Sequence, residues 1–407
     1  MKILVIVGEF PKLSQTFILD QITGFINYGH DVTILAKQPA ADHKVHDDVR
    51  RYRLQEHVVY YGNSRVGRRS RAGKLIQFAA GFLLVLPHLL RHRWHVLAFI
   101  KNPNLILMSR RLLRTDLTDH PVILAHFGPN GLLAQKCMDN GLLRGRLFVA
   151  FHGYDMLRYI RQKGTGVYHD LFHSEAILLP ISAFWRERCL ELGADERRVI
   201  VHHMGINLSL FCLTPIKPQP ILQLVSATRL VEKKGLIYAL EAVRMLTEKG
   251  MKLHYAIAGD GPLAPMLRQR IAEWGLENSV ELLGWCTQTE WLARMRQAQF
   301  VLAPSVTSQD GDMEGIPVQL MEAMAIGRLV IATRHSGIPE LIESGVNGWL
   351  VAERDASQLA EQIERVSQCP QCWTSVAQRA HETIVSEFNG EIQNARLVQL
   401  FEAEEDK

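Results

Sequence analysis

Cysteine is scarce in this sequence, and its spacing argues against a metal-binding or disulfide framework. The 407 residues include six cysteines, of which only Cys369 and Cys372 form a CxxC pair. A structural zinc site needs four ligands, and no second CxxC lies nearby to complete one. A redox role would need a thioredoxin-like setting, whereas this pair follows a predicted helix near the end of the last domain. We therefore expect reduced cysteines and a turn at CPQC.

The sequence also lacks apolar runs of membrane-spanning length. The opening MKILVIVG is too short for a signal peptide and is typical of a buried first strand. A second run, LIQFAAGFLLVLPHLL, is too short for a bilayer and is interrupted by Pro87. We expect a cytoplasmic protein. Its length, with 47% hydrophobic and 22% charged residues, indicates two globular domains.

One long segment contains no acidic residue. Between His57 and Thr115 there is no Asp or Glu, but there are eleven basic residues: Arg65, Arg68, Arg69, Arg71, Lys74, Arg91, Arg93, Lys101, Arg110, Arg111 and Arg114. The whole chain carries +4, so the remainder is net negative, and this asymmetry indicates an anionic partner.

Residues 65–115 predict an interfacial helix on the anionic inner leaflet of the cytoplasmic membrane, because an apolar run is flanked by basic groups. This would make the protein a peripheral membrane protein. The alternative is a set of helices packed on the domain with a solvated basic face. Nucleic acid is not an expected partner, since the segment lacks interleaved aromatic residues and a recognition module.

Strand-length apolar segments alternate with helix-length amphipathic segments, which predicts an α/β fold with two Rossmann-like, doubly wound domains. In the first half, strands are expected at KILVIVG, DVTILA, VVYY, VILAHF, RLFVAFHG, AILLPIS and VIVHHMG. In the second half, they are expected at LQLVSATR, HYAIAG, VELLG, FVLAPS, LVIATR and GWLV. Helices are expected near 236–248, 263–274, 288–297, 317–326 and 355–367.

A proline-rich segment divides the two halves. Pro215, Pro218 and Pro220 prevent a helix and favour an extended connector, so we predict an interdomain linker at 209–220. The amino-terminal domain would then comprise residues 1–208 and the carboxyl-terminal domain residues 221–385.

The segment EGIPVQLMEAMAIG predicts a diphosphate site at the start of a helix. Pro317 suits the first helical position and Gly327 suits the carboxyl-terminal cap. The positive end of the helix dipole would point outward with three backbone N–H groups, those of Gly315, Ile316 and Val318.

Two carboxylates flank this helix start. Glu314 precedes the helix and Glu322 lies one turn inside it, so one can meet a sugar while the other accepts hydrogen bonds from ribose hydroxyls. Asp310 and Asp312 form a DGD sequence just before them, but we do not expect them to bind a metal, and we predict no cofactor.

At these residues the chain resembles glycosyltransferase family 4, the retaining transferases of GT-B fold whose two glutamates are separated by seven residues. In SATRLVEKKGL, Arg229 and Lys234 match the family's basic pair on the donor diphosphate. In AIAGDGPL, Gly259 and Gly261 match its glycine turn. The resemblance implies two Rossmann-like domains that face a cleft, and a final helix, here 386–407, that crosses back to the first domain.

The amino-terminal half is similar to a narrower group, the exopolysaccharide transferases of the colanic acid and amylovoran type, through FPKLSQTFILDQI and AFHGYDM. This similarity implies a lipid-linked saccharide as acceptor. It also implies that His152 is catalytic together with Glu314, by bonding the donor sugar or the incoming acceptor. A histidine at the end of a strand can equally bond a neighbouring carbonyl.

The resemblance assigns the remaining candidates to the substrates. The donor-binding residues are Arg229, Lys234, Gly259, Gly261, Trp285, Gly315, Ile316, Pro317 and Glu322. The acceptor-binding or accessory residues are Ser14, Gln15, Thr16, His126 and Asp155. Two of these assignments have plain alternatives, since the 14–16 segment could cap a helix and Trp285 could be a core residue.

The sequence therefore predicts a retaining, metal-independent hexosyltransferase that uses a nucleoside-diphosphate sugar in exopolysaccharide, capsule or related polysaccharide biosynthesis. Arg229, Lys234 and the amides near Gly315 would stabilise the departing diphosphate. Two alternatives stay open: a non-catalytic scaffold subunit of the same fold, and a nucleotide-sugar epimerase.

Overall fold

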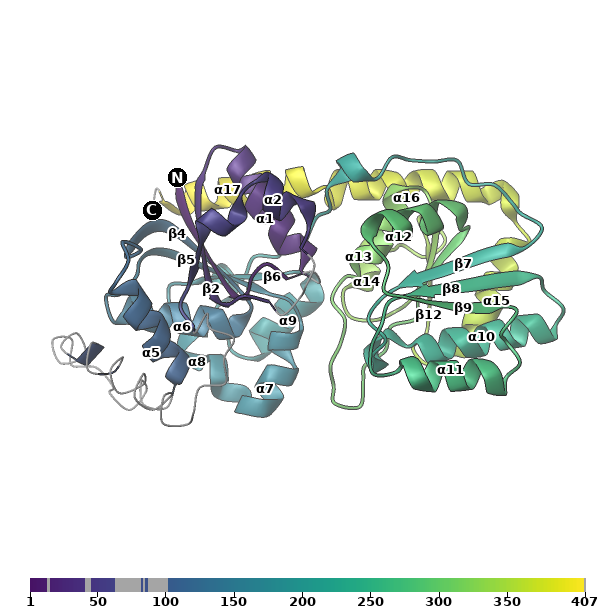
Figure 1. Cartoon of the computed structure of the whole chain (residues 1–407), viewed down its shortest axis with the longest axis horizontal. Helices are drawn as coiled ribbons and strands as arrows, with labels where there is room; N and C mark the ends of the chain where they lie inside the picture. The colour runs from purple at the N-terminus through teal and green to yellow at the C-terminus, as the bar shows by residue number, and fades with distance from the viewer. Residues whose placement is uncertain (13–14, 41–44, 63–81, 83–84, 87–101, 406–407) are drawn as a thin grey trace. The chain divides into compact units, whose positions relative to one another are not determined.

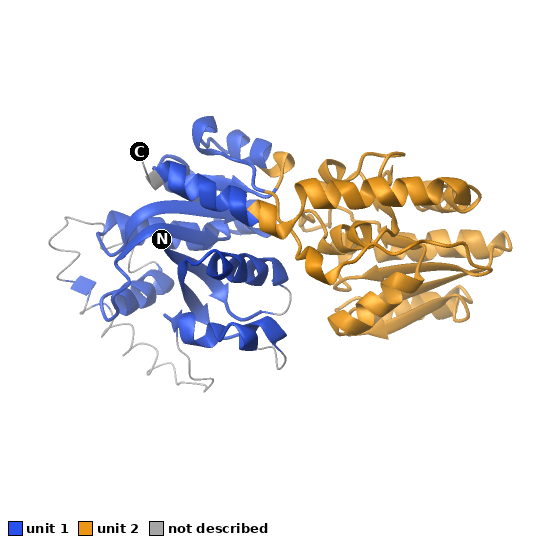
Figure 2. Cartoon of the chain, turned by 90° about the horizontal axis from the view of Figure 1, so that it is seen from above, with its two compact units in different colours: residues 1–181, 186–202, 394–407 blue, residues 182–185, 203–393 orange. Residues whose placement is uncertain are grey.

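The computed structural model describes residues 1–12, 15–40, 45–62, 82, 85–86 and 102–405 (Figure 1). The chain divides into two compact units, shown in blue and orange in Figure 2. Unit 1 comprises Met1–Ile181, Arg186–His202 and Asn394–Lys407, and unit 2 comprises Ser182–Trp185 and His203–Gln393. The change from unit 1 to unit 2 at 202–203 precedes the linker predicted at 209–220.

Unit 1 is built on a six-stranded parallel sheet with the order β3-β2-β1-β4-β5-β6. Its strands are β1 (Lys2–Glu9), β2 (Asp31–Gln38), β3 (Val58–Tyr60), β4 (Asp119–His126), β5 (Arg144–Phe151) and β6 (Ile177–Pro180). Its α-helices are α1 (Thr16–Asn27), α2 (Asp47–Arg51), α5 (Pro103–Leu112), α6 (Gly128–Asp139), α7 (Arg158–Lys163), α8 (His169–Phe172) and α9 (Ala183–Glu191), of which α9 begins in unit 2. Short 3-10 turns are η1 (Leu54–His57), η2 (Tyr154–Met156), η3 (Thr165–Tyr168) and η4 (Glu196–Arg198).

The seventh strand expected at VIVHHMG is wrong. Val199 forms an isolated parallel bridge with Leu178, and the N–H groups of Ile200 and His202 donate to the carbonyls of Leu178 and Pro180. The segment thus lies along the edge of β6 but does not continue as a ladder, because the chain enters unit 2 at His203.

Unit 2 repeats the architecture with the strand order β12-β11-β10-β7-β8-β9, again all parallel. Its strands are β7 (Leu222–Ala227), β8 (Leu253–Ala258), β9 (Val280–Gly284), β10 (Phe300–Ala303), β11 (Leu329–Thr333) and β12 (Trp349–Val351). Its α-helices are α10 (Leu236–Glu248), α11 (Ala264–Glu273), α12 (Gln288–Gln297), α13 (Val318–Ala325), α14 (Ile338–Leu341), α15 (Ala356–Ser367) and α16 (Trp373–Glu387), and its 3-10 turns are η5 (Leu208–Leu210), η6 (Glu232–Lys234) and η7 (Pro370–Cys372).

Both faces of the unit 2 sheet are covered, as the continuous apolar strands predict. Successive strand residues enter opposite cores, with Leu224 of β7 packing in the cluster that contains α10, α11 and α15 side chains. Its neighbour Val225 packs in the cluster that contains α12 and α13 side chains. The alternation follows from the two-residue period of a strand, and it makes the unit doubly wound.

The last helix, α17 (Gly390–Glu405), contributes its carboxyl-terminal part to the core of unit 1. The ring of Phe401 lies 5.8 Å from that of Phe25 and 4.6 Å from that of Phe148. Arg146 of β5 donates to the main-chain carbonyl of Glu404 at 2.7 Å. These contacts hold residues 394–405 on the sheet of unit 1.

The cysteine pair differs from its expected state. Cys369 precedes the turn η7 and Cys372 is its last residue, in agreement with the expected turn, but the two cysteines are paired as a disulfide in the structure rather than present as two separate thiols.

Two predictions fall largely outside the described residues. The first is the assignment of Ser14 to the acceptor. The second is the basic segment 65–115, of which the structure describes mainly 102–115, the region of α5 and the turn that follows it. Within the part of the chain that the structure describes, no helix is long and apolar enough to cross a membrane.

Candidate functional site

The candidate site of unit 2 lies at the carboxyl ends of its strands, where the strand order reverses between β7 and β10. The chain runs outward from β7 to β8 and β9 on one side, and from β10 to β11 and β12 on the other. Ligands of doubly wound sheets bind outside the strand ends at such a reversal. The loops that follow β7 and β10, residues 228–235 and 304–317, carry the predicted basic and acidic residues.

Two lysines of the first loop bind two carboxylates of the second. Lys234 forms an ion pair with Glu314. Lys233 Nζ lies 3.2 Å from Asp312 Oδ2 and donates to the carbonyl of Met313 at 3.0 Å. All four charged side chains are largely buried, between 16% and 20% exposed. The sequence predicted Lys234 and Glu314 as site residues, but it did not predict that they are paired.

This pairing controls the charge of Glu314. Burial alone would raise the pKa of Glu314, but the ammonium groups of Lys234 and Lys233 outweigh it and lower the pKa to about 2. Glu314 is therefore an ionised carboxylate at neutral pH.

Main-chain contacts join the same two loops. The Val306 N–H donates to the carbonyl of Lys233 at 2.9 Å, and the Gln309 N–H donates to Glu232 Oε1 at 2.9 Å. The side chain of Gln319, in the first turn of α13, accepts from the Ala227 N–H at 2.7 Å. The start of α13 is thus fixed beside the end of β7.

Helix α13 differs by one residue from its prediction. It begins at Val318, and Pro317 is the residue before it, with an extended ψ of 124°. The Leu320 N–H bonds the Pro317 carbonyl, and Gly327, at φ +76°, ends the helix as predicted. Among the described residues, no hydrogen-bond partner is found for the N–H groups of Gly315 and Ile316. The role of these amides in binding an anion stays a prediction.

Glu322 is held by a residue that the sequence did not indicate. The indole N–H of Trp291, on α12, donates to Glu322 Oε2 at 3.2 Å. A tryptophan on an amphipathic helix reads as core, and Trp291 is indeed buried, so its polar contact had no signal in the sequence.

The glycine turn after β8 serves the loop after β7. Gly259 has φ +129°, and a Cβ there would lie 1.9 Å from the carbonyl oxygen of Thr228. A Cβ at Gly261 would lie 2.5 Å from the carbonyl oxygen of Leu230. The two glycines therefore allow the turn after β8 to approach the main chain on either side of Arg229. The side chain of Arg229 itself is exposed. Trp285 is 50% exposed on the loop after β9, so the alternative that it is a core residue is wrong.

In unit 1, His126 and His152 come from the ends of neighbouring strands β4 and β5. His126 Nδ1 lies 3.2 Å from His152 Nε2, so one imidazole donates to the other. The ring of His152 also packs against Phe127 at 4.5 Å and Phe17 at 4.9 Å between ring centroids. The alternative for His152, a hydrogen bond to a neighbouring carbonyl, does not describe this contact, because the partner of its Nε2 is the His126 ring.

Both histidines are neutral at physiological pH. Burial, with a smaller effect of His202, lowers the pKa of His126 to about 3. Burial and the two nearby imidazoles lower the pKa of His152 well below its usual value. His126 Nε2 is buried without a hydrogen-bond partner among the described residues. The pair can bond a neutral hydroxyl more readily than an anion.

Asp155 holds the loop that carries His152. Its two carboxylate oxygens accept from the Gly128 N–H at 2.9 Å and the His152 N–H at 3.0 Å. Burial raises the pKa of Asp155 to about 6, in spite of these backbone donors. Since Asp155 is fully buried, the geometry favours the accessory role over direct contact with an acceptor.

The segment after β1 contributes the amino terminus of α1. Thr16 is the first helical residue, and Gln15 precedes it without a side-chain cap bond. Capping therefore does not explain Gln15.

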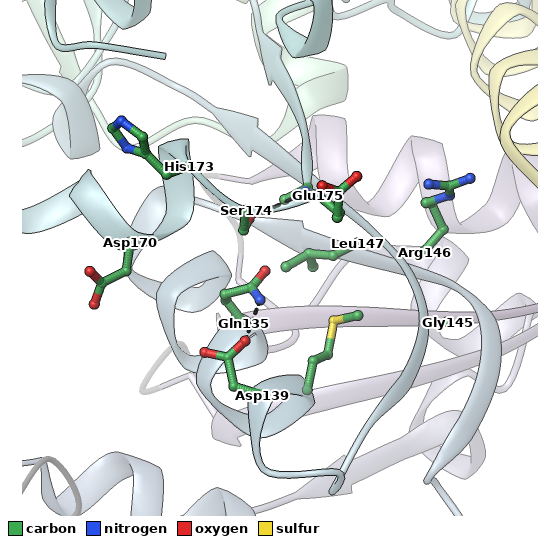
Figure 3. A pocket seen from close by; sticks show the side chains of 11 residues that line it. Gln135, Asp139, Gly145, Arg146, Leu147, Asp170, His173, Ser174 and Glu175 are labelled. Atoms are coloured by element: carbon green, nitrogen blue, oxygen red, sulfur yellow. Dashed lines mark hydrogen bonds between the residues drawn. The ribbon is translucent and has the colours of Figure 1, made fainter. Parts of the chain in front are cut away.

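A separate pocket lies at the amino-terminal ends of β5 and β6 in unit 1. It has a volume of about 630 Å³ and is lined by Gln135, Met138, Asp139, Gly145, Arg146, Leu147, Asp170, His173, Ser174, Glu175 and Ala176 (Figure 3). None of the predicted site residues lines it.

The described ranges contain no group of three or more His, Cys, Asp or Glu side chains arranged for a metal ion. Asp312 is paired with Lys233, and Asp310 accepts from the Ser308 hydroxyl and the Asp312 N–H. Independence from metal stays a prediction.

Comparison with known proteins identifies the family. The family described as "Glycosyl transferases group 1" matches residues 216–383, which contain the Lys234 and Glu314 loops. WcaL of Escherichia coli, named for colanic acid biosynthesis, is 37% identical over 415 residues, covering 99% of this chain and 100% of its own. AmsK of Erwinia amylovora, an amylovoran biosynthesis glycosyltransferase, is 35% identical over 99% of both chains. The chain belongs to this family of glycosyltransferases.

Solved structures agree on the fold of this glycosyltransferase. HepE of Anabaena, crystallised with UDP and glucose, superposes with a TM-score of 0.72 over 99% of both chains at 18% identity. Sucrose-phosphate synthase from Thermosynechococcus elongatus superposes with a TM-score of 0.71 at 15% identity, over 99% of this chain and 98% of its own. The predicted α/β fold of two doubly wound domains, GT-B, is confirmed.

Proposed function

We propose that this glycosyltransferase moves a hexose from a nucleoside-diphosphate sugar, with retention of configuration, to a hydroxyl of a lipid-linked oligosaccharide in exopolysaccharide biosynthesis. The colanic acid and amylovoran relatives support the pathway class. HepE, crystallised with UDP-glucose, supports the donor class. The observation that carries the proposal is the ion pair of Lys234 and Glu314 beside the start of α13.

The donor diphosphate would replace a contact that already exists. Lys234 is held by Glu314 until an anion enters, and it would then share its charge with the diphosphate. The N–H groups of Gly315 and Ile316 and the exposed guanidinium of Arg229 would bind the remaining oxygens. Charge that develops on the leaving diphosphate would meet fixed donors in a site of low water content, which is the electrostatic form of catalysis.

The carboxylates have different proposed roles. Glu314, ionised beside Lys234, would contact the reacting sugar, and Glu322, held by Trp291, would accept hydrogen bonds from the ribose. His152 would bond a sugar or acceptor hydroxyl, with His126 fixing its ring. Retention rests on the resemblance of the two glutamates to those of retaining transferases.

The experiment that tests the proposal uses radiolabelled nucleotide sugars with a membrane lipid extract from a polysaccharide-producing strain as acceptor. Transfer of label into the lipid fraction is expected for wild type and for Glu364→Gln, a matched control in an exposed ion pair with Lys249. A loss of about 100-fold or more is expected for Glu314→Gln. Full activity of Glu314→Gln would contradict the assignment.

Incubation of each donor without acceptor separates the alternatives. Conversion of the donor into an epimer would support an epimerase instead. If no donor is transferred, hydrolysed or epimerised, the result would support a scaffold subunit.

A further inference from the structure

Three loops at the carboxyl edge of unit 2 are joined by one chain of hydrogen bonds. The Glu314 N–H, after β10, donates to His335 Nε2, after β11, at 2.9 Å. His335 Nδ1 lies 2.6 Å from Oε1 of Glu353, which follows β12. The other carboxylate oxygen of Glu353 accepts from the Thr307 N–H, in the loop of Glu314, at 2.8 Å. The carboxylate thus returns the chain of bonds to the loop where it began.

This arrangement fixes the tautomer of His335. A backbone N–H can only donate, so His335 Nε2 must accept, and the ring proton must sit on Nδ1, where it donates to Glu353. The side chain of His335 has no exposed surface, so water cannot take over either bond. An imidazole with its proton on Nε2 would turn an N–H toward the Glu314 N–H and break the connection.

The backbone next to both residues is in an unusual conformation. Ser336 has φ +47° and Arg354 has φ +61°, and each directly follows a member of the pair. Across the described residues, only two other non-glycine residues have positive φ, Arg53 and Phe127. Such conformations persist where the surroundings impose them, and they gather at functional sites. Arg354 also donates to the carbonyl of Thr307, which adds a second tie to the same loop.

We propose that His335 and Glu353 form a positioning dyad that sets the backbone of Glu314. Lys234 holds the Glu314 carboxylate from one side, and the dyad holds its main chain from the other. His335 is a positioning residue, because its ring bonds the backbone of Glu314 and has its second nitrogen occupied by Glu353. The inference rests on the proposed function in one respect only, the assignment of Glu314 to the reacting sugar.

The kinetic test compares His335→Gln with His335→Asn. A glutamine amide reaches the position of Nε2 and can still accept from the Glu314 N–H, whereas an asparagine amide reaches only the position of Nδ1. Donor hydrolysis and transfer are measured with UDP-glucose, UDP-galactose, UDP-N-acetylglucosamine, GDP-mannose and GDP-fucose, together with the melting temperature. We expect kcat to fall about 10- to 100-fold in His335→Asn with KM for the donor nearly unchanged, because misplacement of a reacting group costs rate.

His335→Gln should retain most of the wild-type kcat. Equal rates for the two variants at equal melting temperature would overturn the dyad. Should His335→Asn not fold, Glu353→Gln replaces it, since this change removes the carboxylate that holds the Nδ1 proton and should lower kcat in the same way.

A second readout does not depend on activity. In full-length protein labelled with ¹⁵N-histidine, the signals of His335 are assigned by their loss in His335→Gln, and they should show the proton on Nδ1. A proton on Nε2 would overturn the dyad even in an active enzyme. If no nucleotide sugar reacts while the Nδ1 tautomer is found, the function assigned to Glu314 fails and the structural dyad stands.

Discussion

Lys234 and Glu314 neutralise one another at the point where the strand order of unit 2 reverses. The residues are eighty positions apart in sequence and belong to loops that follow neighbouring strands, β7 and β10. The lysine is thereby held in place before a donor arrives, and the glutamate is kept ionised. A preformed pair reduces the reorganisation that the site needs when charge develops on a leaving group.

The first prediction concerns acid stability. The pKa of Glu314 is lowered from 4.5 to about 2 in the folded protein, so its contribution to the free energy of unfolding is complete above pH 4.5 and is lost as pH falls toward 2. In Lys234→Met the buried carboxylate loses its partner. The variant should be less stable by about 1–3 kcal/mol at pH 7, and by less at pH 4, where its Glu314 is protonated.

Urea unfolding of wild type and Lys234→Met at the two pH values measures this difference. Lys249→Ala serves as control, because it removes an exposed ion pair with Glu364 and should change stability by less than about 1 kcal/mol at both. A Lys234→Met effect that is the same at pH 7 and pH 4 would show that the ion pair does not set the charge of Glu314.

The second prediction concerns the glycine turn. Gly259→Ala places a methyl group 1.9 Å from the Thr228 carbonyl at a φ that disfavours alanine, so the loop that carries Arg229 must move. We expect a loss of roughly 2–4 kcal/mol of unfolding free energy and weaker donor binding. Gly250→Ala is the matched control, since Gly250 also has positive φ, +82°, but nothing lies within 4 Å of an added Cβ. Equal losses in the two variants would attribute the effect to backbone conformation alone.

The sequence predicted the architecture of unit 2 well, because each element there has a clean signal. Helices α10 and α12 occupy their predicted ranges, 236–248 and 288–297, and the latter begins with a capping box between Thr287 and Glu290. The buried parallel strands read as short apolar runs between turn residues. Signals of this kind are local, so a single sequence is enough to reveal them.

The site was predicted less completely, because its partners meet only in three dimensions. His335 and Glu353 each stand just after a strand, but nothing in either segment tells which loop its side chain will bind. The contact of Trp291 with Glu322 could not be predicted, because a tryptophan in a core position gives no sign of which group its indole N–H will bind. The strand predicted at VIVHHMG was wrong for a different reason. An apolar run has the sequence pattern of a strand even where it forms only an isolated bridge with its neighbour.

The third prediction concerns the buried histidine of unit 1. The pKa of His126 is lowered to about 3, so the unfolded chain takes up its proton near pH 6.5 while the folded protein does not. Stability from this group is therefore complete above pH 6.5 and declines as pH falls, by up to about 1.4 kcal/mol per pH unit.

His126→Asn can keep the hydrogen bond to His152 but has no titrating ring. Between pH 6.5 and pH 4.5 its unfolding free energy should fall less steeply than that of wild type in urea titrations. His169→Asn, at an exposed position, should leave the wild-type slope unchanged. A slope in His126→Asn equal to that of wild type would mean that His126 accepts a proton in the folded state.

The fourth prediction concerns membrane association through residues 65–115, which the sequence suggests. Basic side chains near an anionic surface contribute about 1 kcal/mol each. Replacing Arg65, Arg68, Arg69 and Arg71 by alanine should then weaken binding to phosphatidylglycerol vesicles by roughly a thousand-fold in a flotation assay. A control variant carries the same number of changes at exposed positions of unit 2: Arg268, Arg270, Arg294 and Arg296. If wild type does not float with these vesicles, the membrane partner is wrong.

The central claim is that a nucleotide-sugar diphosphate binds beside Lys234, and a thermal-shift screen of nucleotide sugars on wild type and Lys234→Ala tests it most directly. A ligand that binds the folded protein raises its melting temperature. We predict that at least one donor raises the melting temperature of wild type and that the shift is lost in Lys234→Ala, while Lys249→Ala retains it. A shift of equal size in wild type and Lys234→Ala would contradict the claim, and so would the absence of a shift with every donor.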